Sequence, residues 1–287
     1  MNDPLPEPAR YFPFAAGRYE VKPGLSRLGR DFGNGPRDAQ VFQRDREAGR
    51  YLAAKQTVRG GPAHYAQHNF DGPARDAVCD FIGARLAAEH PDVDRSRVSG
   101  AADRFDALAT LVQEDLCVHR VEGDRDWLAA AHLSFPNGWS AAEKVGRDFA
   151  AIHDPVPHFE PIARAAAAHA RVMVESTDGL VRFAWGVAFT DDLDLSPGSA
   201  ARRPPPRVED AVVRVERQTI WGFPAVGAAL FTIRTYLYPC DALAPQLKAS
   251  LADAIESMSQ QSRQYKGLAD LADPLVRRLR HGREPSR

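Results

Sequence analysis

The stretch AVVRVERQTIWGFPAVGAALFTIRTYLY, residues 211–238, decides the fold. Two runs rich in β-branched and aromatic residues, 211–220 and 228–238, flank a turn around Gly222, Pro224 and Gly227. Runs of this kind, separated by Gly and Pro, are typical of paired strands. The sequence therefore predicts an antiparallel hairpin.

A third strand is predicted before the hairpin. Over residues 181–189, apolar side chains alternate with small residues and Arg182, which is the period of a half-buried strand. The segment DDLDLSPGSAARRPPPR, residues 191–207, then combines Pro, Gly and charge. We expect this segment to be a flexible surface loop without regular structure.

Helical periodicity occurs in several segments, where apolar residues recur every three to four positions. These segments are residues 75–88, 102–117, 160–174 and, with a polar break, 247–279. The first 70 residues lack periodicity, and we expect loops and short elements laid over a core. Helices first and antiparallel strands later indicate one α+β domain over residues 1–287, with its sheet in the second half.

A further helix is predicted after a capping box, in which Ser140 is followed three residues later by Glu143. Val145, Phe149 and Ile152 then form an apolar stripe. The helix is expected to run without a break to the proline-rich segment that follows.

His153 joins this stripe on the last predicted turn. An imidazole that points from an apolar helix face into a pocket is a suitable axial ligand for haem iron. A lone histidine at a helix end more often caps the last carbonyls of its own helix. The spacing by itself favours this structural role.

The hairpin strands carry an unusual density of charge. Arg214, Glu216 and Gln218 share one face of the first strand, whereas Arg217 points to the other. On the second strand, Arg234 and Tyr236 share a face with Thr232. Such a pattern fits a solvated face with cross-strand ion pairs, or a polar cavity wall whose arginines hold carboxylates.

Composition excludes several classes of protein. Hydrophobic residues make up 44% of the 287 residues and the net charge is -1, so the chain is globular and lacks a strongly basic surface for nucleic acid or membranes. No apolar run is long enough to span a bilayer, and the N-terminus does not read as a signal peptide. Three separated cysteines argue against a disulfide scaffold, and we expect a cytoplasmic protein.

Fingerprints of nucleotide and hydrolase chemistry are missing from the sequence. No GxGxxG opens a βαβ unit, and neither GxxxxGK[ST] nor GxSxG occurs. Composition and spacing therefore indicate only an α+β protein with an unassigned polar pocket.

Three segments carry a resemblance to a known family. They are YFPFAAGRYEVKPGL, SFPNGWSAAEKVGRDFAAIHDPVP, and VVRVERQTIWGFPAVGAALFTIRTYL followed by QYKG. Together they resemble the haem-dependent oxidative N-demethylase α-subunit family over most of the chain, about residues 12–267. The resemblance implies a PAS-like fold, an antiparallel sheet with packed helices that holds haem b, here with an N-terminal extension and C-terminal helices.

The family's activity is the oxidation of a small secondary amine, dimethylamine, to a primary amine and formaldehyde with O₂. Electrons come from NADPH through partner subunits that carry FMN and iron–sulfur clusters. This chain has no nicotinamide or flavin fingerprint and no cysteine cluster, so the resemblance implies that it is the oxygen-activating component. It would work with a flavin and iron–sulfur reductase.

The resemblance also implies a set of residues for cofactor binding and catalysis. The histidine of the IHxPVP motif is His153, the candidate haem-iron ligand. The RxERQT and TIRTY motifs supply the remaining candidates, with Trp185 from the preceding strand, but the match does not say which of them touch haem, substrate or each other. We expect catalytic roles for Glu216 and Tyr236, and cofactor contacts for His153, Arg214, Arg217, Gln218, Arg234 and Trp185. Where the family usually has Asn-Trp, this chain has Ala184-Trp185, which leaves the substrate open.

Two other functions compete with this one. A PAS-like haem or small-ligand sensor would bind without catalysis, although the chain contains no recognisable output segment. A structural subunit that has lost its cofactor would show no haem absorption at all.

Overall fold

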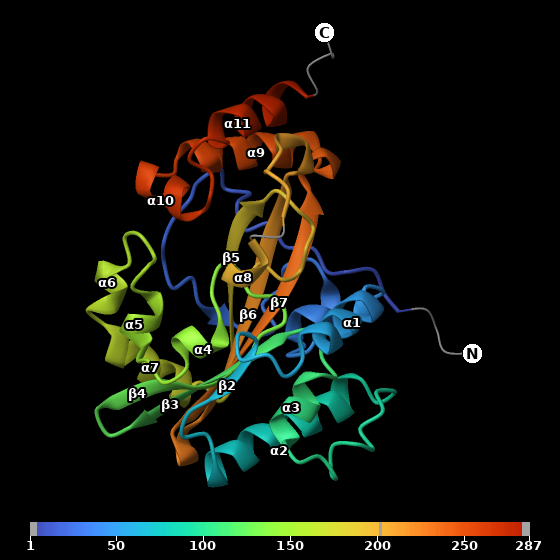
Figure 1. The fold of residues 1–287 in the computed structure, drawn as a ribbon, viewed down its shortest axis with the longest axis vertical. Helices are drawn as coiled ribbons and strands as arrows, with labels where there is room; N and C mark the ends of the chain where they lie inside the picture. Colours follow the sequence, from blue (N-terminus) through green and yellow to red (C-terminus); the bar gives the residue numbers. More distant parts are fainter. Residues whose placement is uncertain (1–4, 201–202, 283–287) are drawn as a thin grey trace.

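The computed structural model describes residues 5–200 and 203–282, and in them seven strands form one antiparallel sheet (Figure 1). The strand order is β1-β5-β6-β7-β3-β4-β2. The strands are β1 (Ser26–Arg27), β2 (Tyr65–Gln67), β3 (Asp115–Glu122), β4 (Arg125–His132), β5 (Leu180–Ala188), β6 (Val212–Phe223) and β7 (Ala228–Pro239). The α+β class is thus confirmed.

Helices surround the sheet on both faces. They are α1 (Ala48–Val58), α2 (Gly72–Glu89), α3 (Arg104–Ala109), α4 (Ala141–Lys144), α5 (Phe149–His153), α6 (Glu160–Ala163), α7 (Ala166–Glu175), α8 (Pro197–Ala200), α9 (Pro245–Glu256), α10 (Gln260–Tyr265) and α11 (Ala272–His281). Figure 1 shows α9, α10 and α11 gathered at one end of the long strands, and α2 and α3 at the other. In the described residues, no helix is long and apolar enough to cross a membrane.

The predicted hairpin is confirmed as β6 and β7. Val215 lies opposite Tyr236, and the connection is a short 3-10 turn, Pro224–Val226. Gly227 closes this turn with φ +59°, a left-handed conformation that glycine adopts without steric cost. The strand before the hairpin is also confirmed, as β5.

The prediction that the sheet lies only in the second half was wrong. The helix expected over residues 102–117 ends with α3, and Leu116 and Cys117 belong to β3. Both residues and the following Val118 are buried, because helices cover both faces of the sheet here. A short apolar run that is buried on two sides cannot be told from a helix by its spacing.

The unbroken helix expected after Ser140 was also wrong. Val145 is extended at φ -63° and ψ 134°, and Gly146 has φ +89°. At this break the chain pairs with the neighbouring strand, because the N–H of Gly146 donates to Leu128 O and Arg147 O accepts from Leu128 N, both at 2.8 Å. These long-range backbone bonds separate α4 from α5, so Val145 and His153 do not share one helical stripe.

Other expectations changed in detail. The helix predicted over residues 160–174 is divided into α6 and α7, and the polar break in the tail contains α10. The first 70 residues do lie over the core, but they include the eleven-residue helix α1. The segment 191–207 is not wholly irregular, because it contains α8 and buries Leu193 and Leu195, while residues 201 and 202 lie outside the described residues. Its flexibility stays a prediction.

The two faces of the sheet have different coverings. One face packs against α2, α3, α9, α11 and the N-terminal segment around Tyr11 and Phe14. We call it the closed face. The opposite face packs against α4, α5 and α7 through small apolar clusters around Cys117 and Ile220. We call it the open face, because its apolar covering stops short of the middle of β6.

Gly222 offers a test of how tightly α7 lies on the open face. A Cβ atom at this position would come within 2.1 Å of the Val174 carbonyl oxygen, which is backbone and cannot turn away. We expect Gly222→Ala to lower the free energy of unfolding by about 1–3 kcal/mol, the usual cost of overpacking. Urea denaturation measures this change.

The matched control is Gly83→Ala in α2, where nothing lies within 4 Å of the added Cβ. This substitution should be neutral or stabilise by about 0.5–1 kcal/mol, because alanine favours a helix. Equal effects of the two substitutions would contradict the close contact between β6 and α7.

Candidate functional site

The register of β5 and β6 gathers polar side chains on the open face. Arg182 lies opposite Gln218, and the small residues Ala184 and Gly186 lie opposite Glu216 and Arg214. Residues that lie opposite each other in an antiparallel pair point to the same face of the sheet. Every second residue along one strand also points to that face. We call the set Arg182, Arg214, Glu216 and Gln218 the polar row.

Arg214 anchors one end of the polar row and is only 1% exposed. Its Nη2 donates to Phe135 O and, at 3.0 Å, to Leu193 O, and its Nη1 donates to Asp192 O at 3.4 Å. The guanidinium therefore holds the segment after β5 against the sheet. Its Nε has no hydrogen-bond partner among the described residues.

Glu216 lies in the middle of the polar row and is half-buried. One carboxylate oxygen accepts a hydrogen bond of 2.9 Å from Gln218 Nε2, while the buried Gln218 Oε1 has no partner in the part of the chain that the structure describes. Burial lowers the pKa of Arg182 and of Arg214, and the Glu216 charge opposes this shift in both. A half-exposed carboxylate can accept hydrogen bonds from a ligand.

Lys266 joins the polar row from the end of α10. Its Nζ donates to Trp185 O at 2.8 Å, and burial lowers its pKa while Glu216 opposes the shift. Lys266 was not among the residues selected from the sequence. The QYKG motif contains it, but only the packing of α10 against β5 shows that it reaches the polar row.

His153 closes α5, which packs against the open face. Its Nδ1 lies 2.8 Å from Phe149 O, and its ring stacks on Phe159 with centroids 4.7 Å apart. Burial lowers the pKa of His153 to about 4, so the ring is neutral at pH 7. Because a carbonyl oxygen only accepts, Nδ1 carries the proton and Nε2 keeps its lone pair.

The bond to Phe149 O is the helix-capping contact that the sequence favoured, and it does not compete with ligation. It orients the ring and leaves Nε2 as the coordinating atom, which is how metal-bound histidines are commonly held. The charges of Lys144 and Arg182 both add to the lowering of the His153 pKa.

A second contact fixes the position of α5. Asp126 on β4 accepts hydrogen bonds from Phe149 N at 2.7 Å and from His119 Nε2 at 2.8 Å. Phe149 therefore receives support from the sheet at its N–H and supports His153 at its carbonyl. This arrangement connects residues from β3, β4 and α5, and no local sequence signal predicts it.

The other predicted residues lie on the closed face. Arg217 donates to Asp38 O and Gln40 O at 3.2 and 2.7 Å, and the Tyr236 hydroxyl donates to Gln43 Oε1. The remaining two are equally enclosed. They are Arg234, paired with Asp45 at 2.7 Å, and Trp185, whose ring packs on Phe14 and Tyr19. The structure therefore separates Trp185, Arg217, Arg234 and Tyr236 from Glu216 by the thickness of the sheet.

The closed face is a network of buried polar groups that contact one another. The buried Arg234–Asp45 pair fits the alternative in which the hairpin arginines hold carboxylates, and not a solvated face. Nearby Glu114 is 1% exposed, and burial raises its pKa to about 7. Lys55 is fully buried, and its Nζ donates to Glu114 O at 2.6 Å.

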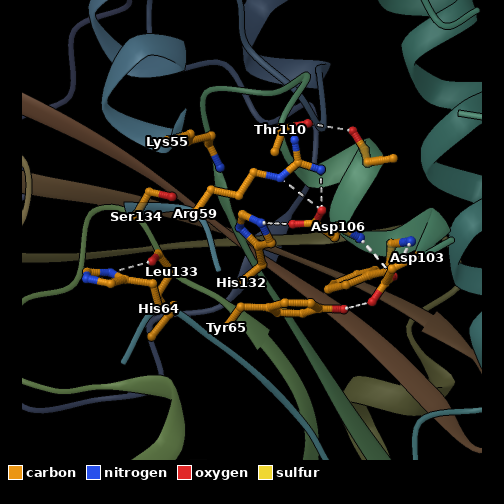
Figure 2. A network of polar contacts seen from close by, with 12 residues as sticks. Lys55, Arg59, His64, Tyr65, Asp103, Asp106, Thr110, His132, Leu133 and Ser134 are labelled. Carbon is orange, nitrogen blue, oxygen red and sulfur yellow. Dashed lines mark hydrogen bonds and ion pairs between the residues drawn. The ribbon is translucent and has the colours of Figure 1, made fainter. Parts of the chain in front are cut away.

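Figure 2 shows the continuation of this network around His132. The His132 Nε2 lies 3.1 Å from Asp106 Oδ1, and Arg59 binds the same carboxylate. Asp106 has a pKa of about 2, lowered first by the bond to His132. Tyr65 donates to Asp103 at 2.6 Å, so the network joins β2 and β4 to α3. It contains none of the site residues predicted from the sequence. Its contacts hold β2, β4 and α3 together, which is a structural role.

Most of the chain matches a known protein family. Residues 62–276 match a protein-family model described as haem-dependent oxidative N-demethylase, alpha subunit-like. No curated protein matches the chain. The matched region contains every residue of the polar row, Lys266 and His153. Within the described residues, no group of three or more His, Cys, Asp and Glu side chains could hold a metal ion.

Substitution of Arg234 tests the structural role of the closed face. Arg234→Leu leaves Asp45 buried without its partner, so we expect the free energy of unfolding to fall by about 3–5 kcal/mol. Arg27→Leu is the control, because the Arg27–Asp178 pair is exposed and should contribute less than about 1 kcal/mol. Urea denaturation of both variants decides the question, and similar small losses would show that the closed face is solvated.

Proposed function

The chain belongs to the haem-dependent oxidative N-demethylase alpha-subunit-like family, and from this premise we propose that it is the haem-binding, oxygen-activating subunit of an N-demethylase. The substrate in this proposal is a small secondary amine such as dimethylamine, and the products are a primary amine and formaldehyde. The observation that carries the proposal is the state of His153. Its imidazole is neutral, its Nδ1 is hydrogen-bonded to Phe149 O, and its Nε2 keeps a lone pair for a metal.

The residues around His153 fit haem b. A single neutral nitrogen donor is enough to hold haem iron from one side, and aromatic rings of Phe149 and Phe159 flank the imidazole. The cations Arg182, Arg214 and Lys266 outnumber the carboxylates that act on them, which are Glu216 and, at Arg214, Asp115. Haem b carries two propionate groups, and guanidinium and ammonium groups are their usual partners. The antiparallel sheet with helices on both faces supports the PAS-like assignment.

Haem, when bound, supplies the oxygen chemistry that side chains cannot perform. The chain's own groups orient the reactants. His153 presents Nε2, and the Glu216 carboxylate can accept a hydrogen bond from the N–H of the amine. We do not extend the catalytic proposal to Tyr236, because its hydroxyl is engaged with Gln43 on the closed face.

One position near Glu216 departs from the family pattern. Ala184 lies directly opposite Glu216 in the β5–β6 pair, where the resemblance leads us to expect an asparagine. This chain therefore has a methyl group instead of an amide beside the carboxylate. The change enlarges the space next to Glu216 and removes one hydrogen-bonding group, so the preferred amine can differ from dimethylamine.

The proposal also requires partners. Demethylation with O₂ places one oxygen atom in formaldehyde and the other in water, so electrons must come from outside the amine. We assign NADPH, FMN and iron–sulfur clusters to reductase subunits, in line with the α-subunit designation of the family. A cytoplasmic location, where NADPH is supplied, belongs to the same proposal.

His153→Ala tests the haem ligand. We expect the purified, haem-supplied variant to lose or strongly shift its Soret band, because the iron loses its protein nitrogen, while the far-ultraviolet circular dichroism stays unchanged. His158→Asn is the control, since His158 is exposed in the same segment, hydrogen-bonds Ser259, and has φ +61°, which asparagine tolerates. A Soret band in His153→Ala identical to that of the wild type would refute the assignment.

The second test concerns the electron supply. The haem-loaded chain with NADPH and dimethylamine under air should release no formaldehyde, because hydride arrives as an electron pair and haem iron accepts single electrons. Addition of a flavin and iron–sulfur reductase should start turnover, measured as formaldehyde. Sustained turnover by the chain alone would contradict the division between subunits. Haem binding without turnover under any condition would favour a sensor.

A further inference from the structure

One end of the polar row borders a cavity of about 170 Å³. It lies between β5, the segment before α4 and the end of α10, and it is large enough for a small organic group. Its lining residues are Asn137, Gly138, Gly186, Val187, Ala188, Arg214, Tyr265 and Lys266. Gly186 forms part of one wall, where a Cβ atom would make an ordinary contact of 3.5 Å with the Lys266 side chain.

Two cationic groups line this cavity, and neither has a full set of acceptors. Arg214 is 99% buried, and its Nε has no partner among the described residues. Lys266 Nζ donates to the carbonyl of Trp185 at 2.8 Å, and an ammonium group has two further N–H donors. Both groups line the cavity, and hydrogen bonds to backbone carbonyls hold their side chains in place.

The local charges do not balance. Arg214 is buried, whereas Arg182 and Lys266 are half-buried; Glu216 acts on all three cations, and Asp115 acts in addition on Arg214. Burial of a charge without a counter-ion is unfavourable, so proteins rarely retain an unpaired buried cation. The imbalance at this end of the polar row is a net positive charge, which an anionic ligand would compensate.

We propose that the cavity between Arg214 and Lys266 is a carboxylate-binding site. The planar guanidinium and the mobile ammonium provide directed donors to one carboxylate group. The inference rests on the proposed function for the source of this carboxylate, which is either a haem propionate or the acid group of an N-methylamino acid. In the second case Glu216, two residues from Arg214 on the same face, would bind the ammonium end of the same molecule.

Lys266→Met removes the ammonium and keeps the length of the side chain. Lys266→Arg retains the charge, and Lys248→Met in α9 is the matched control because Lys248 does not line the cavity. If a propionate is the ligand, Lys266→Met should weaken haem b binding about tenfold in a Soret titration, and Lys266→Arg should restore it. Haem b dimethyl ester, which lacks the carboxylates, should bind the wild type and Lys266→Met equally.

If the substrate provides the carboxylate, haem b binding should be the same in all variants. N-methylglycine should then perturb the Soret band of the wild type at concentrations at least tenfold lower than those required for Lys266→Met. Dimethylamine should not distinguish the two proteins.

A third measurement does not depend on haem. Succinate should raise the melting temperature of the haem-free wild type and of Lys248→Met, but not of Lys266→Met. If haem fails to bind and succinate still stabilises selectively, the carboxylate site stands and the haem proposal fails. If Lys266→Met equals the wild type with haem b, N-methylglycine and succinate, the carboxylate site is overturned.

Discussion

The pairing of β6 between β5 and β7 is the constraint on which the rest of the structure depends. Once Val215 lies opposite Tyr236 and Trp185, each side chain of β6 is assigned to one face of the sheet. Arg217 then points to the closed face, while Arg214 and Glu216 point to the open face. A shift of one residue would exchange every one of these assignments, so the register is strongly specified by the buried faces.

Both faces hold a buried arginine through backbone carbonyls, but their surroundings differ. On the closed face the N-terminal segment and the region around α1 supply carbonyls and a carboxylate, so Arg217 and Arg234 are bound within the protein. Unpartnered buried atoms occur on both faces among the described residues: Arg217 Nε and Nη1 and Arg234 Nε on the closed face, and Arg214 Nε and Gln218 Oε1 on the open face. The open face differs because Arg214 also lines a cavity, and incomplete hydrogen bonding beside a cavity is typical of a site that binds something.

The position of His153 shows how a short element becomes a defined ligand site. A helix of five residues has little stability by itself, and α5 depends on contacts with its surroundings. Asp126 supplies one such contact through Phe149 N, while Asp148 caps the first turn. The neutral state and the tautomer of His153 are then consequences of burial and of one carbonyl oxygen.

The sequence by itself determined the elements whose information is local. Alternation and turn residues were enough to predict β5, the β6–β7 hairpin and the shared face of Arg214, Glu216 and Gln218. The family motifs could also be recognised from the sequence. The break between α4 and α5 was not predictable from spacing, because backbone bonds to Leu128 on β4 produce it. Likewise the helical spacing of residues 102–117 extends into the start of β3, and only the pairing of β3 with β4 and β7 shows that the helix has ended.

Only the tertiary structure decided which polar residues meet. Asp45 reaches Arg234 across 189 residues of sequence, and Lys266 reaches the carbonyl of Trp185 across 81. Spacing within a strand states which face a side chain occupies, but not what covers that face. The covering segments are distant in the chain, and their hydrogen bonds and charges decide whether an arginine becomes part of the core or remains available at a cavity.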